Sequence, residues 1–111
     1  MFPTLQSVVL NSNKTPIKLD FLRAKKASLI LRAINHKLRQ QLLKLIDENG
    51  RMTVTEVYVK MRLEQSVTSQ HLAILRRCGF LLTEREGKFI YYSVNYKRLT
   101  DVVMFVEKLL D

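Results

Sequence analysis

Residues 61–81, MRLEQSVTSQHLAILRRCGFL, are the most informative part of this sequence. Thr68, Leu72 and Leu75 recur at helical spacing and predict one buried stripe of a helix. Gly79 predicts where that helix ends, because glycine is the usual residue just past a helix C-terminus. The side opposite the stripe carries small or hydrogen-bonding residues at the front and cations at the back: Gln65, Ser66, Ser69, Gln70, Ala73, Arg76 and Arg77. Such a face could read base edges and hold phosphates, but a solvated polar face explains the same pattern.

The segment before this helix reads as a second, shorter helix. Residues 52–61 have Thr53 at the predicted N-cap and Glu56 three residues later, the spacing of a capping box. A tight polar connection at residues 62–65 then leads into the longer helix. A short helix, a tight turn and a longer helix are the pattern of a helix-turn-helix.

The segment after the longer helix predicts a β-hairpin. Residues 81–85 and 89–94 are rich in β-branched and aromatic residues, and Gly87 between them suits a tight hairpin turn. We therefore predict a mainly α fold with a small β-hairpin, a winged helix-turn-helix. The helix-turn-helix spans about residues 53–79 and the wing about residues 81–94.

Length and charge agree with one small nucleic-acid-binding domain. The chain has 111 residues and 47% hydrophobic content, which suffice for a single domain with a core. Its net charge of +9 favours nucleic acid or an acidic surface as partner. Residues 1–40 hold eight Lys and Arg against one acid, so the excess of cations lies outside the predicted recognition helix.

Cysteine content and hydropathy bear on the cellular compartment and on catalysis. A single cysteine, Cys78, excludes an intramolecular disulfide and fits a reducing compartment. No apolar run is long enough to cross a bilayer, and residues 8–10 are too short for the core of a signal peptide. We expect a cytoplasmic protein with no membrane partner. Two histidines and no Gly-rich phosphate loop give little support to an enzyme.

The remaining segments predict an arm and three further helices. Residues 1–16 contain both prolines and a turn-like NSNKTP cluster, so we expect a flexible N-terminal arm, with at most a short ordered piece at residues 5–10. Residues 17–111 are expected to form the single domain. Its first helix should begin at Ile17 or Leu19, and a second, residues 36–48, should bury Leu38, Leu42, Leu45 and Ile46.

The first and last predicted helices are both too apolar for the surface of a monomer. Residues 17–34 and 95–110 carry apolar side chains on more than one side. We predict that they form the interface of a homodimer, which would place two recognition helices one duplex turn, about 34–36 Å, apart. The predicted interface residues are Leu19, Leu22, Leu29, Ile30, Val102, Phe105, Val106 and Leu109.

From residue 31 to residue 94 the sequence resembles the ArsR/SmtB-type family of bacterial winged-helix repressors. The matching parts are AINHKLRQQLL at residues 33–43, with Arg39 at the family's usual arginine; QSVTSQHLAILRRCGFL at residues 65–81, the recognition-helix signature; and REGK at residues 85–88 with Tyr91 and Tyr92, the wing. The resemblance implies a homodimer that binds a palindromic operator in double-stranded DNA and represses transcription in the bacterial nucleoid.

The sequence departs from that family at its metal-sensing positions. Members that sense metals commonly carry a Cys-x-Cys pair where this chain has Thr53 and Thr55, which are poor ligands for a soft metal. Residues 95–111 lack the histidine of the family's other usual site. With only Cys78, His36 and His71 available, a four-ligand tetrahedral site cannot be assembled within one subunit, so we expect no metal site there and no cofactor. The inducing signal stays open.

The candidate DNA contacts come from the recognition helix and the wing. Ser69 and Gln70 are the best candidates for base edges, because a glutamine amide can pair with adenine N6 and N7. His71 fits a packed histidine that is hydrogen-bonded to a neighbouring helix, with some phosphate contact. The full set is Gln65, Ser66, Thr68, Ser69, Gln70, His71, Arg76, Arg85 and Lys88.

Three functions remain open at this point. A sequence-specific dimeric regulator, more consistent with a repressor than an activator, agrees with most of the features above. A winged-helix module for protein assembly, whose basic charge is incidental, is the alternative from another class. A metal or redox sensor whose ligands come from both subunits has less support.

Overall fold

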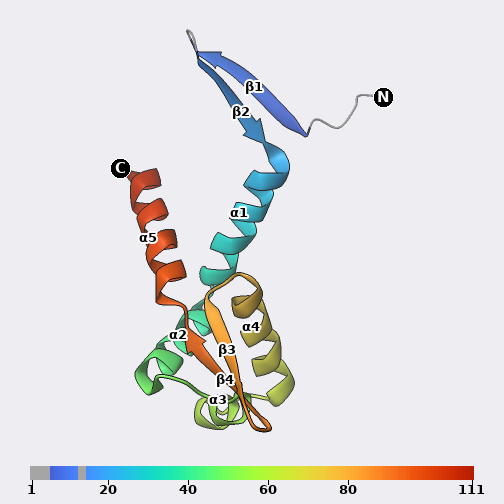
Figure 1. The fold of residues 1–111 in the computed structure, drawn as a ribbon, viewed down its shortest axis with the longest axis vertical. Coiled ribbons are helices and arrows are strands. Elements are labelled where there is room, and N and C mark those ends of the chain that lie inside the picture. Colours follow the sequence, from blue (N-terminus) through green and yellow to red (C-terminus); the bar gives the residue numbers. More distant parts are fainter. Residues whose placement is uncertain (1–5, 13–14) are drawn as a thin grey trace. The chain divides into compact units, whose positions relative to one another are not determined.

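The computed structural model describes residues 6–12 and 15–111, and Figure 1 shows their helices and strands in chain order. The chain divides into two compact units, of which the second is Ala33–Asp111 and the first contains the described residues up to Arg32. None of the helices in the described residues has the length and apolar character needed to cross a bilayer.

The first unit begins with a β-hairpin. Strand β1 (Ser7–Ser12) pairs antiparallel with β2 (Thr15–Asp20), and helix α1 (Phe21–Ile34) follows directly. The expected helix start at Ile17 or Leu19 is therefore wrong. Strand β1 overlaps the short ordered piece expected at residues 5–10 and extends beyond it, whereas residues 1–5 of the expected arm lie outside the described residues. The physical reason in β2 is that Ile17 and Leu19 are two residues apart, which is strand spacing, and β1 pairs with that strand.

The end of β2 marks where helical spacing takes over. The Asp20 carboxylate accepts a hydrogen bond from the backbone N–H of Arg23 at 3.1 Å, as an N-cap side chain does. Leu19, predicted on the first helix, thus lies on β2.

The second unit is the predicted winged helix-turn-helix, and Figure 1 shows the β-hairpin following the long recognition helix. The fold class is confirmed: four helices and one two-stranded sheet lie between Lys37 and Leu110 in the order α2, α3, α4, β3, β4, α5. Their bounds are Lys37–Asn49, Val54–Met61, Gln65–Arg77, Leu81–Glu86, Phe89–Val94 and Tyr96–Leu110.

Local sequence signals set the ends of these elements. The Thr53 hydroxyl accepts from the backbone N–H of Glu56 at 3.2 Å, and the Glu56 carboxylate accepts from the N–H of Thr53 at 3.0 Å. The predicted capping box is confirmed. In the wing, Glu86 pairs with Phe89, so Gly87 occupies a two-residue turn with φ of 63°.

The core of the second unit lies between α2, α3, α4 and the base of the wing. Its fully buried side chains are Leu42, Ile46, Val57, Thr68, Leu72, Leu75 and Phe80. At the base of the wing, Leu81 and Val94 face each other in the hairpin and are also buried. The wing is therefore anchored at its base by the same core that holds the recognition helix.

Backbone hydrogen bonds fasten the wing to the linker between α2 and α3. Met52 forms a β-bridge with Tyr92, donating its N–H at 3.0 Å and accepting from the N–H of Tyr92 at 2.7 Å. Met52 is buried. Strand β4 is thus hydrogen-bonded to β3 on one side and to Met52 on the other, which fixes the direction of the hairpin relative to the helices.

The start of α5 is tied to the end of the recognition helix. The Asn95 side chain donates to the carbonyl of Gly79 at 2.9 Å, and Nε of Arg98 donates to the carbonyl of Cys78 at 3.0 Å. A side chain at Gly79 would place its Cβ 3.1 Å from Nε of Arg98, and φ there is 86°. The positive φ favours glycine, and any other residue would also require the Arg98 side chain to shift by a few tenths of an ångström.

Candidate nucleic-acid interface

Helix α4 presents one continuous polar face to solvent. With 3.6 residues per turn, seven of its residues fall within an arc of about 140°. They are Gln65, Ser66, Ser69, Gln70, Ala73, Arg76 and Arg77, all exposed except the half-buried Ala73. No acidic residue occurs in α4, and both arginines lie in its last turn. The front of this face can exchange hydrogen bonds with base edges, and its back can hold phosphate.

Thr68 does not belong to this face, and its prediction as a DNA contact is wrong. The side chain is fully buried, and its hydroxyl donates to the carbonyl of Glu64 at 3.0 Å. The hydroxyl is satisfied inside its own helix, so it can lie among the apolar residues without a buried unpaired group. Thr68 instead packs the first turn of α4 against the core.

His71 holds α4 against α2, as predicted for a packed histidine. Nε of Arg39 donates to Nδ1 of His71 at 3.2 Å, and Nη1 of Arg39 donates to the carbonyl of Ala33 at 3.1 Å. The ring of His36 lies 5.0 Å from that of His71. Burial, followed by the charges of Arg39 and His36, lowers the pKa of His71 from its ordinary 6.5. The neutral ring then accepts at Nδ1, which leaves only Nε2 to donate.

The register of the wing separates its side chains into two faces. Residues directly opposite each other in an antiparallel pair share a face. Thr83 pairs with Tyr92 and Arg85 with Ile90, whereas Glu84 pairs with Tyr91 on the other face. The acidic residues of the wing are therefore on the face opposite Arg85.

A shallow hollow joins the wing to the recognition helix. It has a volume of about 460 Å³ and is lined by Ala73, Arg76, Arg77 and Tyr92. Two exposed cations beside a tyrosine suit a phosphate oxygen. The sequence placed Arg77 on this face, but Arg77 was left out of the predicted set of contacts. Tyr92 was absent from that set too, and strand alternation could have indicated it.

The two cations predicted to meet DNA from the wing are both exposed in the structure. Nε of Arg85 donates to the carbonyl of Gly87 at 3.2 Å, and Nζ of Lys88 lies 5.4 Å from the centre of the Phe89 ring. Both side chains are exposed, at or beside the tip of the hairpin. Their predicted DNA contacts are sterically open.

Arg51 neutralises one of the acids of the wing. Nη1 of Arg51 lies 2.6 Å from a carboxylate oxygen of Glu86, and its guanidinium stacks 4.0 Å from the centre of the Tyr91 ring. The ion pair with Glu86 raises the pKa of Arg51 above its usual value. The negative charge of Glu86 is thereby partly screened from a phosphate backbone nearby.

Metal-ligating side chains do not gather in the described part of the chain. Among those residues, no group of three or more His, Cys, Asp or Glu side chains is placed to hold a metal ion. Cys78 is half-buried at the C-cap of α4.

Residues 36–82, which run from the start of α2 through the recognition helix to the base of the wing, match the family described as "Bacterial regulatory protein, arsR family". An uncharacterised helix-turn-helix transcriptional regulator of Methanocaldococcus jannaschii is 31% identical over 84 residues, covering 76% of this chain and 94% of the relative. The chain belongs to the ArsR family. It is a DNA-binding transcriptional regulator, and its named relatives are regulators rather than enzymes.

Two further relatives, one compared by sequence and one by structure, are similar over most of this chain. The transcriptional activator HlyU of Vibrio cholerae is 31% identical over 84 residues, which cover 76% of this chain and 77% of HlyU. The crystal structure of the transcriptional repressor PagR of Bacillus anthracis superposes with a TM-score of 0.62 at 26% identity. That match covers 83% of this chain and all of PagR.

Proposed function

We propose that this ArsR-family protein is a homodimeric repressor that binds a palindromic operator. One α4 from each subunit enters the major groove, with Ser69 and Gln70 at base edges and Gln65 and Ser66 at the first turn. The basic residues of the hollow and the wing hold the flanking phosphates. The observation that supports this most directly is the exposed face of α4, which is polar in front, cationic behind and free of acids.

The dimer is supported by apolar side chains that the chain does not cover. Leu22, Leu29, Phe105 and Leu109 are between 47% and 64% exposed. On each helix these side chains leave apolar surface open to water, which soluble proteins rarely do unless that surface meets a partner. The half-buried Ile30, Val102 and Val106 flank them on α1 and α5. A two-fold dimer would also match the two half-sites of a palindrome.

Repression is the simplest consequence of such binding. A dimer that covers two successive major grooves excludes other proteins from that DNA. The named relatives include both an activator and repressors, so the position of the operator relative to the promoter decides the sign. Such a protein acts where the chromosome lies, in agreement with the cytoplasmic, nucleoid-associated location expected from the sequence.

Selection of bound duplexes from a random library tests the proposal at about physiological salt. Wild-type protein should enrich an inverted repeat whose half-sites are about one duplex turn apart. Gln70→Ala should relax the preference at one or two positions of each half-site, with about a 5- to 100-fold loss of discrimination there. Ser69→Ala should weaken a neighbouring position.

Gln41→Ala is the matched control, because Gln41 is an exposed glutamine on α2, outside the proposed interface. It should enrich the same repeat as wild type. Enrichment of no sequence, with only salt-dependent binding to every duplex, would refute sequence-specific regulation. That result would instead support a winged-helix module for protein assembly.

A further inference from the structure

The N-terminal hairpin has one apolar and one polar face. In its register Val8 lies opposite Leu19 and Leu10 opposite Ile17, so these four residues share a face. The other face carries Ser7, Val9, Asn11, Pro16, Lys18 and Asp20. The second face is polar except for Val9 and Pro16, whereas all four residues of the first set are apolar. A sheet with one mainly apolar face is one that packs on that side.

Most of this apolar face is uncovered in the single chain. Leu10, Ile17 and Leu19 are each about half exposed, at 51%, 49% and 49%. An isolated two-stranded hairpin is marginally stable in water, and independent stability requires more strands or packing against another surface. A stable hairpin therefore requires another surface that packs against these apolar side chains.

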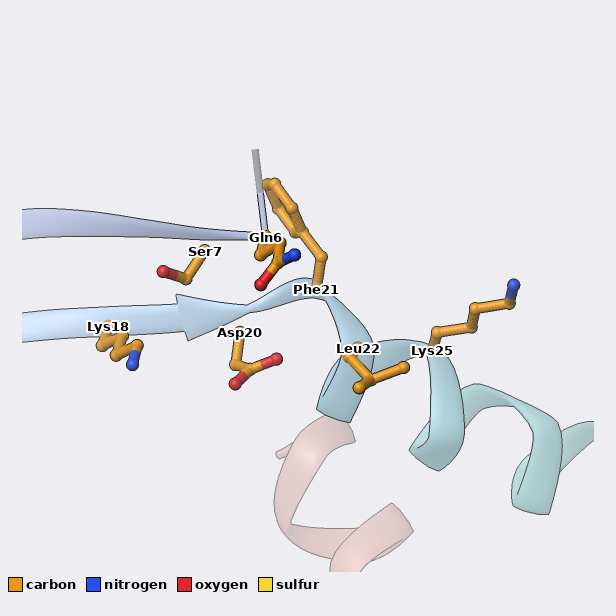
Figure 2. Close-up of a pocket in the computed structure, with 7 residues that line it drawn as sticks. All are labelled: Gln6, Ser7, Lys18, Asp20, Phe21, Leu22 and Lys25. Atoms are coloured by element: carbon orange, nitrogen blue, oxygen red, sulfur yellow. The ribbon is translucent and has the colours of Figure 1, made fainter. Parts of the chain in front are cut away.

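The apolar face continues past the hairpin into α1. The N–H of Phe21 donates to the carbonyl of Gln6 at 2.8 Å, which extends the pairing by one residue. Figure 2 shows Lys18 and Asp20 extending from one side of β2, and Phe21 extending to the other. Phe21 is 44% exposed, and Leu22 on the first turn of α1 is 58% exposed. Phe21 and Leu22 line an open hollow at this junction together with Gln6, Ser7, Lys18, Asp20 and Lys25, so apolar side chains are open to solvent where β2 meets α1.

We propose that the apolar face of the hairpin packs against a second copy of this chain. This inference rests on the homodimer proposed above and extends its interface to residues 8–21. DNA is a poor occupant, because none of the described residues on this face is a cation that could meet phosphate. In a dimer, the second subunit is always present to pack against the apolar face of the hairpin.

The size of a stable interface supports the same occupant. Stable interfaces use about 20–30 residues on each side. Seven of the eight interface residues predicted from the sequence lie on α1 and α5, and the eighth, Leu19, is on this hairpin. The apolar residues of the hairpin enlarge that set without a break in the chain. They also precede residues 36–82, the part that matches the ArsR family, so the extension is outside the matched region.

Neighbouring residues on opposite faces give a matched pair of variants. Leu10 and Val9 are almost equally exposed in the single chain, at 51% and 53%, but Leu10 is on the apolar face. In full-length protein, sedimentation equilibrium should show that Leu10→Glu raises the dimer dissociation constant at least about tenfold. Val9→Glu, which faces Lys18, should stay within about threefold of wild type. Circular dichroism checks that both variants keep their helices.

Hydrogen exchange shows whether the cover comes from the other subunit. The amides of β1 and β2 should be protected well above the dimer dissociation constant and exchange much faster well below it. Equal protection at both concentrations would mean that the hairpin is covered by its own chain, which overturns the inference.

The outcomes separate this inference from the proposed dimer. A wild-type protein that stays monomeric at every concentration refutes both. A wild-type dimer that Phe105→Glu dissociates, but that Leu10→Glu leaves as tight as Val9→Glu, keeps the helical interface and refutes the role of the hairpin. Weakening by Leu10→Glu and by Phe105→Glu, with Val9→Glu unaffected, supports both.

Discussion

Helices α4 and α5 are both amphipathic, but they differ in what covers their apolar residues. Helix α4 buries Thr68, Leu72 and Leu75 completely within its own chain. Helix α5 has no buried residue, and Phe105 and Leu109 on it are 50% and 64% exposed. Only the polar face of α4 is open to solvent, whereas α5 exposes apolar side chains.

This difference indicates how the two helices contribute to function. The position of α4 is fixed by one chain, through the core and through the contact of His71 with Arg39, so a single subunit already presents its polar face. The apolar surface of α5 is consistent with a helix completed by another molecule. We infer that base reading is a property of each subunit, and that the spacing between two half-sites is a property of the dimer.

The largest expected effect is on the free energy of unfolding, when one leucine on each helix is replaced by alanine and the two losses are compared. Leu72→Ala should lower the free energy of unfolding by about 2–5 kcal/mol, because it removes a fully buried side chain and leaves a cavity. Leu109→Ala removes a largely exposed side chain and should change the stability of a single subunit by about 0.5 kcal/mol or less. Urea unfolding followed by circular dichroism measures both.

Protein concentration makes this comparison sharper. If α5 lies in a dimer interface, the loss caused by Leu109→Ala should grow with protein concentration, because association adds to the apparent stability of wild type. The loss from Leu72→Ala should depend far less on concentration. A loss from Leu109→Ala that is large and the same at all concentrations would show that α5 is buried by its own chain.

A smaller effect is expected from the cations of α4. Arg76→Ala and Arg77→Ala should each reduce the slope of log affinity against log salt by about 1, because each removes one phosphate contact. Fluorescence anisotropy with a selected duplex at several salt concentrations gives the slope. Lys44→Ala is the control, since Lys44 is an exposed lysine on α2 that pairs with Glu48. If both arginine variants keep the wild-type slope, the hollow beside Tyr92 does not contact phosphate.

Most of the second unit could be predicted because its signals are local. The capping box of Thr53 and Glu56, the stop at Gly79 and the turn at Gly87 each depend on one or two residue types at fixed spacing. The stripe that contains Leu72 and Leu75 repeats often enough to define its period. Fold class and the exposed face of α4 follow from these signals.

The first unit was predicted less well because its segments are short. Ile17 and Leu19 fit a strand, but Leu19 and Leu22 also fit a helix, and so few residues do not determine the period. The burial of Thr68 was predicted by its place on the stripe, yet its polar character also made it a candidate contact. Its hydrogen bond to the carbonyl of Glu64 resolves that conflict, and only the folded helix shows it.

The smallest expected effect is the pH dependence of stability that His71 contributes at the contact between α4 and α2. Burial and the neighbouring Arg39 and His36 hold the pKa of His71 below 6.5, so the unfolded chain binds a proton more tightly than the folded protein. The free energy of unfolding should therefore fall as the pH drops below 6.5, and this contribution should be fully restored above that value. A proton on Nδ1 would also displace the hydrogen bond from Arg39.

His71→Gln isolates this contribution, because glutamine keeps an acceptor for Arg39 but does not titrate. Urea unfolding of both proteins between about pH 5 and pH 8 gives a difference curve for His71 alone, with the other titrating groups in common. Wild type should lose more stability than the variant as the pH falls. A flat difference curve, or one of opposite sign, would mean that the pKa of His71 is not lowered by its position between α4 and α2.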